Sequence, residues 1–210
     1  MLPLLDGSVA VVCAADSAIA AGVADVDTSY GRLAGDSAIA GSLGAAIDVR
    51  GVRGAVDLRY RYLQSAGIFV DYEDGFGEGS EPLRLLVAGF ELRPLFLARY
   101  LQGHELGSPR LDLLIDSLAL ELGAFVGQPA LGGFGDSAGL SFGLGLELPL
   151  LPRASGPMLS LRAAIRWSRE ALSAADPTSV DVEAFVFTVA IGWQQTFGSH
   201  VVDVGDERSP

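Results

Sequence analysis

Residues 140–150, with the sequence LSFGLGLELPL, carry the pattern that decides the fold. Every second residue of this stretch is leucine or phenylalanine, and the residues between them are small, charged or proline. A period of two is the pattern of a β-strand with two different faces. A helix would mix the two sets, and each glycine would weaken it by about 1 kcal/mol. The stretch therefore predicts a strand.

The same alternation recurs along the chain and predicts about eight strands. Besides 140–150, the segments are 38–50, 52–63, 158–170 and 182–197, and less regularly 8–27, 83–101 and 111–126. Pro94 interrupts the segment 83–101, which predicts a bulge or a break there. The alternation of 111–126 changes phase near residues 116–117. Residues 8–27 are rich in alanine, so a short helix is an alternative to a first strand.

The connections between these strands differ in length. Short ones fall near 50–52 and 151–157, a middling one at 102–110, and longer ones at 28–36, 66–81, 127–137 and 172–180. Short turns at one end, longer loops at the other and an even number of strands are typical of outer-membrane barrels. We therefore expect an all-β fold, an antiparallel up-and-down transmembrane barrel formed as one domain by residues 1–197. Residues 1–30 are expected as a first strand or an N-terminal extension, and 198–210 as a tail.

Composition and charge exclude several classes of protein. Of the 210 residues, 50% are hydrophobic and 19% are charged, so a disordered chain is excluded. The net charge of −12 argues against nucleic-acid binding, because phosphate is bound by surplus positive charge. No run of about 20 apolar residues predicts a transmembrane helix. The N-terminus lacks the basic start of a signal peptide.

The alternating faces have two interpretations. In a soluble barrel the apolar side chains form the core, whereas in a membrane barrel they face lipid and the polar side chains line the lumen. Three features favour the membrane barrel. The polar face is rich in Gly, Ala and Ser, it carries charges of both signs that can pair when buried, and aromatic residues lie towards strand ends.

Two sets of site residues follow from the membrane interpretation. The predicted ion network of the lumen comprises Asp48, Arg50, Asp57, Arg59, Arg61, Glu91, Arg93, Glu121, Glu147, Arg162 and Arg166. The predicted aromatic residues at the lipid–water interface are Tyr60, Tyr62, Tyr100, Trp167, Trp193 and Phe197.

The chain resembles a known family over residues 8–197. Its last predicted strand contains VFTVAIGWQQTF, in which Gly192 precedes the terminal Phe197 by five residues and apolar residues alternate upstream. This pattern is similar to the barrel-assembly signal, although Gln195 stands where an apolar residue is usual. With the alternating strands, it resembles the eight-stranded OmpA/OmpX-type barrels of Gram-negative bacteria. The resemblance implies an outer-membrane location, a lipid bilayer around the barrel, and the barrel-assembly machinery as partner of the last strand.

The sequence predicts no enzyme, cofactor or metal site. Nucleophilic catalysis requires a base within reach of the nucleophile, but His104 lies in a predicted turn and His200 in the tail. The loop 71–81 is rich in carboxylates, which calcium favours, yet its spacing does not match an EF-hand. A solvated acidic loop is the preferred interpretation. The single cysteine, Cys13, excludes an intramolecular disulfide.

The lumen of an eight-stranded barrel is just filled by side chains. The sequence therefore predicts a non-enzymatic scaffold that presents surface loops and has a mostly plugged lumen. Two alternatives stay open, a narrow pore for small or apolar solutes and a soluble, lipocalin-like barrel with an apolar ligand cavity.

Overall fold

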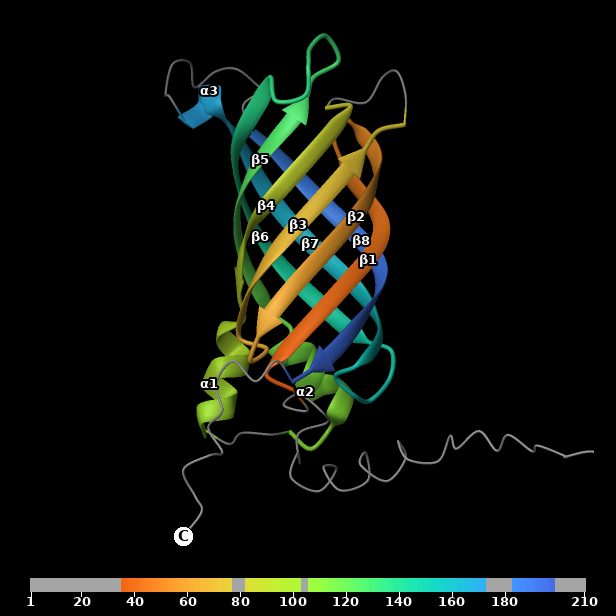
Figure 1. The fold of residues 1–210 in the computed structure, drawn as a ribbon, viewed down its shortest axis with the longest axis vertical. Coiled ribbons are helices and arrows are strands. Elements are labelled where there is room, and N and C mark those ends of the chain that lie inside the picture. Colours follow the sequence, from red (N-terminus) through yellow and green to blue (C-terminus); the bar gives the residue numbers. More distant parts are fainter. Residues whose placement is uncertain (1–34, 77–81, 103–105, 173–182, 199–210) are drawn as a thin grey trace, which may run out of the picture.

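A computed structural model describes residues 35–76, 82–102, 106–172 and 183–198. In it, eight antiparallel strands form a closed barrel in chain order, and β1 pairs with β8 (Figure 1). The strands are β1 (Ser37–Asp48), β2 (Gly51–Tyr62), β3 (Ala66–Asp74), β4 (Arg84–Leu92), β5 (Ala119–Gln128), β6 (Ser137–Pro149), β7 (Gly156–Ser168) and β8 (Glu183–Phe197). The predicted all-β, up-and-down barrel of eight strands is confirmed.

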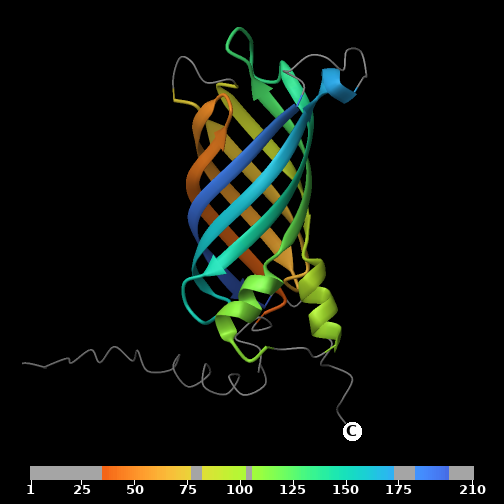
Figure 2. The same cartoon turned by 180° about the vertical axis from the view of Figure 1, so that it is seen from behind.

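The described residues also form three short helices, which lie at the ends of the barrel. Helices α1 (Pro94–Gln102) and α2 (Pro109–Asp116) belong to the connection between β4 and β5, and α3 (Arg169–Leu172) follows β7. Figure 2 shows α1 and α2 together at the end opposite α3. None of the described helices is long and apolar enough to cross a membrane.

The period of two places one kind of side chain on each side of the barrel wall. In β6, Leu144 pairs with Leu120 of β5 and faces outward, whereas the neighbouring Gly143 pairs with Glu121 and faces the lumen. The same alternation continues around the closed sheet. Part of the lumen is filled by an apolar cluster of Phe69, Leu85, Val87 and Phe125.

The segment 66–81, predicted as a long loop, contains strand β3. The prediction was wrong because the consecutive apolar residues Ile68, Phe69 and Val70 hide the alternation of this segment. In the structure, Phe69 faces the lumen while Ile68 and Val70 face outward. The barrel thus obtains its eight strands within residues 37–197. The strand predicted at 8–27 lies outside the described residues, as does the tail from residue 199 onward.

Two predicted strands are partly helical. The segment 83–101 is a strand only as far as Leu92, and Pro94 starts α1, because proline fits the first turn of a helix. The segment 111–126 begins in α2 and becomes strand β5 at Ala119. The predicted interruption at Pro94 and the change of phase near 116–117 therefore mark the ends of secondary-structure elements. The middling connection at 102–110 joins two helices.

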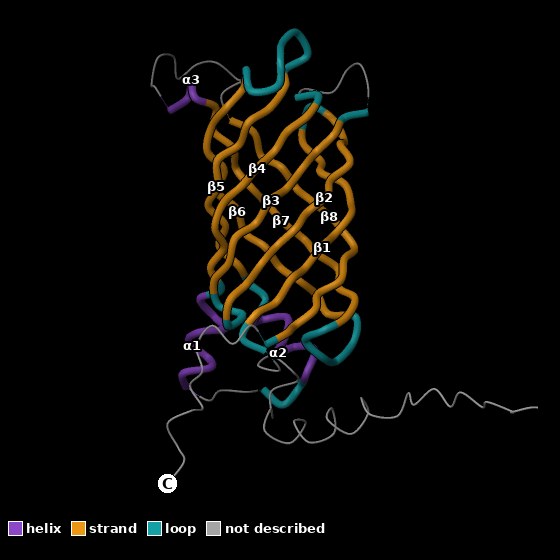
Figure 3. Tube along the Cα trace, viewed as in Figure 1, coloured by secondary structure: helices purple, strands orange, loops and turns teal. Residues whose placement is uncertain are grey.

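The predicted arrangement of short and long connections is also wrong. At the end of the barrel that carries the start of β1 and the end of β8, the connections are 63–65, 93–118 and 150–155. At the other end they are 49–50, 75–83, 129–136 and the segment between β7 and β8. Figure 3 shows the loops and helices confined to these two ends. We call them the termini end and the loop end. Short and long connections occur at both, because the unpredicted strand β3 shifts the two strands before it, β1 and β2, by one place.

Candidate functional site

The outer surface of the barrel is apolar. Leu43 and Ile191 are each 67% exposed and Phe90 is 72% exposed, whereas the lumen-facing Arg59 and Arg61 are each 1% exposed. A soluble protein hides its large apolar side chains and exposes its charges. This barrel has the opposite arrangement, so a surrounding apolar phase would remove its outer face from water.

The lumen near the loop end holds a group of four charged side chains from β1, β2, β3 and β7. Arg53 donates to Asp48 at 2.8 Å and to Glu73 at 2.9 Å. Arg166 donates to both carboxylate oxygens of Glu73, at 2.5 and 3.1 Å. Glu73 therefore joins two arginines that come from opposite parts of the sequence, and this pairing ties β2, β3 and β7 together across the lumen.

The middle of the lumen is arranged around Arg59. Its Nε donates to Asp57 at 2.6 Å, and its Nη1 donates to Glu91 at 2.5 Å and to Glu121 at 2.6 Å. Arg162 from β7 donates to Asp57 at 3.1 Å and lies 3.3 Å from Glu121. Charges of both signs are thus interleaved, which compensates the loss of hydration that each would suffer alone.

A third group of lumen side chains, which we call the lower layer, lies towards the termini end. Arg61 donates to Glu91, to Glu147 and, at 2.6 Å, to Gln194 of β8. Arg93, just beyond β4, donates to Glu147 at 2.5 Å. Burial lowers the pKa of the Arg93 guanidinium, and the nearby Arg61 charge acts in the same direction. The Glu147 and Glu91 carboxylates oppose both effects.

The predicted network residues differ in where they lie. Arg50 lies in the turn after β1, where its backbone N–H donates to Asp48 at 2.7 Å. The other ten have ion pairs within the barrel. Sequence reasoning missed Glu73 and Asp71 because it placed them in a loop. Phe69, Asp71 and Glu73 are spaced two residues apart, so they share one face of a strand while Ile68 lies on the other face. This spacing was the available signal.

The predicted interface aromatics fall into three groups. Tyr60, Tyr62, Trp193 and Phe197 lie on the strand segments near the termini end, and Trp167 lies near the loop end. Tyr60, Trp193 and Phe197 are exposed on the outer surface. Tyr100 is not on a strand: it belongs to α1 and stacks on Phe96, with ring centroids 5.9 Å apart. Its predicted place on a strand was wrong because the strand ends before Pro94.

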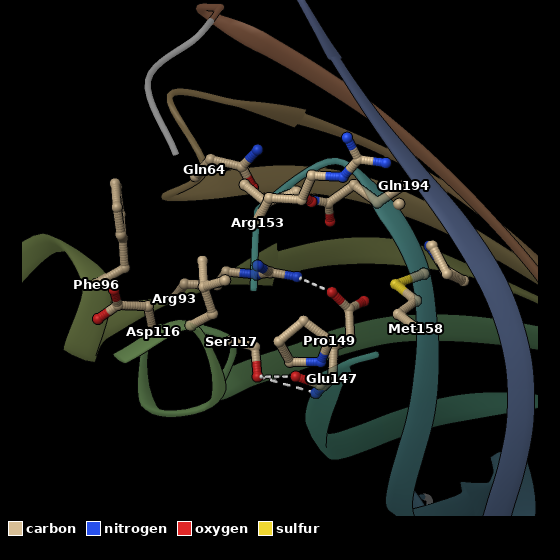
Figure 4. Close-up of a pocket in the computed structure, with 14 residues that line it drawn as sticks. Gln64, Arg93, Phe96, Asp116, Ser117, Glu147, Pro149, Arg153, Met158 and Gln194 are labelled. Atoms are coloured by element: carbon tan, nitrogen blue, oxygen red, sulfur yellow. Dashed lines mark hydrogen bonds and ion pairs between the residues drawn. The ribbon is translucent and has the colours of Figure 1, made fainter. Parts of the chain in front are cut away.

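A cavity opens at the termini end, between the lower layer and helices α1 and α2. The space within it that the centre of a water molecule can reach is about 40 Å³. Figure 4 shows Arg93 and Glu147 at its inner side, Phe96 and Asp116 from the helices, and Met158 from β7. Ser117 holds the helix against the barrel, because its hydroxyl bonds both the backbone N–H and the carbonyl of Glu147.

The described residues contain no group of three or more His, Cys, Asp or Glu side chains that could hold a metal ion. The lumen carboxylates are paired with arginines instead. His104 and His200, considered above as bases, lie outside the described residues.

These features define a class: an antiparallel transmembrane β-barrel with an apolar exterior and a charged, filled lumen. No protein-family model and no curated protein matches the chain. Solved structures to which the chain shows similarity include Ail, the attachment invasion locus protein of Yersinia pestis, and Neisserial surface protein A.

The likeness to these structures is low in sequence. Ail in complex with the heparin analogue sucrose octasulfate is 14% identical, with a TM-score of 0.36, over 76% of this chain and 96% of Ail. Ail in a phospholipid bilayer nanodisc is 16% identical, with a TM-score of 0.35, over 77% and 99%. Neisserial surface protein A is 13% identical, with a TM-score of 0.36, over 77% and 96%.

Proposed function

We propose that this chain is an integral β-barrel of a bacterial outer membrane, without enzymatic activity, that acts as a rigid scaffold for the loops of its loop end. The observation that carries the proposal is the inverted polarity of the wall, apolar outside and charged inside. A lipid bilayer stabilises such a wall, whereas water would leave the apolar outer face exposed.

The filled lumen supports a scaffold in preference to a pore. Ion pairs join side chains across the barrel at three levels, for example Arg166 with Glu73 and Arg61 with Glu147. Apolar side chains such as Phe69 and Phe125 occupy further lumen space. A wall held by so many cross-links suits a rigid platform, and the connections 75–83 and 129–136 at the loop end would face the cell exterior.

Site-specific labelling tests which face meets lipid. Single cysteines at two adjacent β6 positions, Leu144→Cys and Gly143→Cys, are made in a Cys13→Ser background and reconstituted in phospholipid vesicles. The proposal expects a lipid-phase thiol reagent to label position 144 and to spare position 143. Labelling of 143 in preference to 144 would instead support a soluble barrel with an apolar core.

Refolding from urea provides a test of the membrane requirement. The proposal expects a compact band on an unheated denaturing gel only when detergent or lipid is present, and its loss on heating. Folding to a soluble monomer in plain buffer would contradict the proposal and favour the lipocalin-like alternative.

We propose further that β8 is the strand read by the barrel-assembly machinery. Phe197 ends the strand, is 36% exposed on the outer face, and follows Gly192 on the lumen side. Phe197→Ala should lower the fraction of chain inserted in the outer membrane of cells, while refolding in detergent stays intact. The matched control is Phe187→Ala, on the same outer face but nearer the loop end. Equal loss for both variants would argue against a terminal signal.

A further inference from the structure

The cavity at the termini end has polar groups that the barrel does not use. Gln64 lines it, is 5% exposed, and its Nε2 has no hydrogen-bond partner among the described residues. Arg93 also lines it, and its Nε lacks a hydrogen bond and lies 3.7 Å from Glu91. Buried donors without acceptors are rare in proteins because each loses its hydration without replacement.

The acceptors of the cavity are already engaged. Glu147 accepts hydrogen bonds from Arg61 and Arg93, and Asp116 accepts one from Arg99 at 2.8 Å. The polar groups of the cavity that still lack a hydrogen-bond partner are therefore N–H donors. A ligand that satisfies them must bring an acceptor, and a negatively charged acceptor is the most favourable.

The mouth of the cavity carries an additional positive charge. Arg153, in the turn between β6 and β7, is exposed and lines the cavity. In Figure 4 its side chain extends between Gln64 and Gln194. Gln194 is occupied, because its Oε1 accepts from Arg61 and its Nε2 donates to the backbone carbonyl of Ala154. Within the described part of the chain, no carboxylate forms an ion pair with the Arg153 guanidinium.

The remaining wall of the cavity is apolar. It is formed by Phe96 and Leu113 of the two helices, by Pro149 and Pro157 at the strand ends, and by Met158. Phe96, Leu113 and Met158 are buried, at 3%, 8% and 4% exposure. Apolar walls with a few convergent polar groups are the usual construction of a site for a small molecule.

The position of Gln64 is fixed by an uncommon backbone. Leu63 and Gln64 both have positive φ, 47° and 54°, in the turn 63–65 between β2 and β3. Glycine and asparagine adopt positive φ most readily, so a leucine–glutamine pair is costly there. The turn is nevertheless anchored, since Leu63 N–H donates to the Asp36 carbonyl at 2.7 Å. The backbone thus holds the Gln64 amide at the cavity.

We propose that this cavity binds a small organic monocarboxylate with an apolar body. Its carboxylate accepts hydrogen bonds from Gln64 and Arg153, and its apolar part lies against Phe96, Leu113 and Met158. The site borders the lumen network at Arg93 and Glu147, and it goes beyond the scaffold function proposed above. The ligand would bind at the termini end of the barrel.

The chain contains its own reporter for this binding. Its two methionines are Met1 and Met158, and Met158 lines the cavity. Protein carrying ¹³C-methyl methionine, refolded into phospholipid nanodiscs, should show one methyl signal that shifts saturably on titration with sodium benzoate. Met158→Leu assigns that signal. Benzamide, which has the same ring but no charge, should cause a much weaker shift at equal concentration.

Two arginine variants identify the charge contact. Arg153→Gln should weaken benzoate binding by roughly tenfold, the scale of one charge-assisted hydrogen bond. Because Arg153 is exposed, this variant should fold as the wild type does. Arg84→Gln is the matched control, since Arg84 is 58% exposed at the loop end, and it should leave the affinity unchanged.

Three results would overturn the proposal. These are a Met158 signal that does not respond saturably to benzoate, an equal response to benzamide, and an affinity that Arg153→Gln leaves unaltered. None of them depends on the outcome of the lipid-labelling experiment, so the two proposals fail independently.

Discussion

At the scale of single residues, the outward leucines decide whether the barrel is compatible with a bilayer. Leu144 is 47% exposed and lies near the middle of β6, between Leu120 and Ala163 of the adjacent strands. Leu144→Arg should lower the free energy of unfolding by about 2–4 kcal/mol in lipid vesicles, as expected for a cation near the bilayer midplane. Urea titration read on unheated gels measures this.

A control for Leu144→Arg is available in the loop between β5 and β6. Leu131 is fully exposed there, so Leu131→Arg adds the same charge outside the lipid-facing band. Its unfolding midpoint should match that of the wild type. Equal destabilisation by both substitutions would show that the added charge acts without regard to the bilayer.

The lumen charges depend on one another residue by residue. Glu91 has ion pairs with Arg59, Arg61 and Arg93. Glu91→Gln keeps the shape and removes the charge, which leaves three buried cations with less compensation. The free energy of unfolding should fall by about 3–5 kcal/mol, the scale for breaking a buried ion pair. Asp136→Asn, at an exposed loop carboxylate, is the control and should change stability little.

At the scale of elements, the sequence predicts strands well where apolar and small or charged residues strictly alternate. β2 and β6 have this pattern, and their lumen charges, Arg59 and Glu147 among them, could be placed from the sequence. β3 could not, because Phe69 faces inward between two outward apolar residues and removes the contrast. Helix α1 was missed because Phe96 and Tyr100 continue the alternation of β4, with Arg99 on the opposite face, much as a strand would.

The helices also illustrate an interaction that periodicity alone does not reveal. Arg99 of α1 pairs with Asp112 and, at 2.8 Å, with Asp116 of α2. Asp112 and Asp116 are 0% and 4% exposed, so this contact holds the two helices together at the barrel mouth. The two helices can pair only because α1 ends at residue 102 and α2, which begins at residue 109, lies beside it. The alternation of apolar residues does not predict this arrangement.

Replacing Arg99 should loosen the helix pair without unfolding the barrel. Arg99→Gln leaves two buried carboxylates poorly compensated, and the helices make fewer contacts with the barrel than the strands make with one another. We expect faster backbone hydrogen exchange in 94–116 and unchanged protection in β6 and β7. A general loss of protection across the strands would show instead that the helices are required for the barrel itself.

Glycines in the lumen wall give a second prediction for elements. A Cβ at Gly89 would lie 2.2 Å from the Leu122 carbonyl oxygen and 2.5 Å from Gly123, both backbone atoms of β5. At Gly143 the closest atom would be 3.3 Å away. Gly89→Ala should therefore lower the unfolding midpoint more than Gly143→Ala, because β4 and β5 must separate. The reverse order in urea titrations would refute the close approach of these strands.

At the scale of the whole molecule, the number of strands was predictable but their assignment to the two ends was not. The missed strand, β3, reverses the direction of the strands that precede it. The turn at 49–50 therefore lies at the loop end and not at the termini end as predicted, whereas 150–155 lies at the termini end as predicted. The lumen network likewise depends on closure. Arg166 and Glu73 are 93 residues apart, and only the β1–β8 pairing fixes which side chains meet.

Closure of the barrel around paired charges leads to a prediction about conduction. The single side chain of Arg59 forms ion pairs with four carboxylates, those of Asp57, Asp71, Glu91 and Glu121. It therefore occupies the centre of the lumen. An eight-stranded barrel has little space beyond its side chains. The wild type in planar bilayers should therefore give no discrete current steps.

Arg59→Ala removes the central guanidinium and leaves its carboxylates facing the vacated space. We expect any current of this variant to be cation-selective, since the local charge becomes negative. Arg84→Ala, at the exposed rim, should stay silent like the wild type. Discrete steps in the wild type that change in size with Arg59→Ala or Glu147→Gln would favour the narrow pore over the scaffold. In that case the ion network would be a selectivity filter, because the same charges that close a lumen select ions in an open one.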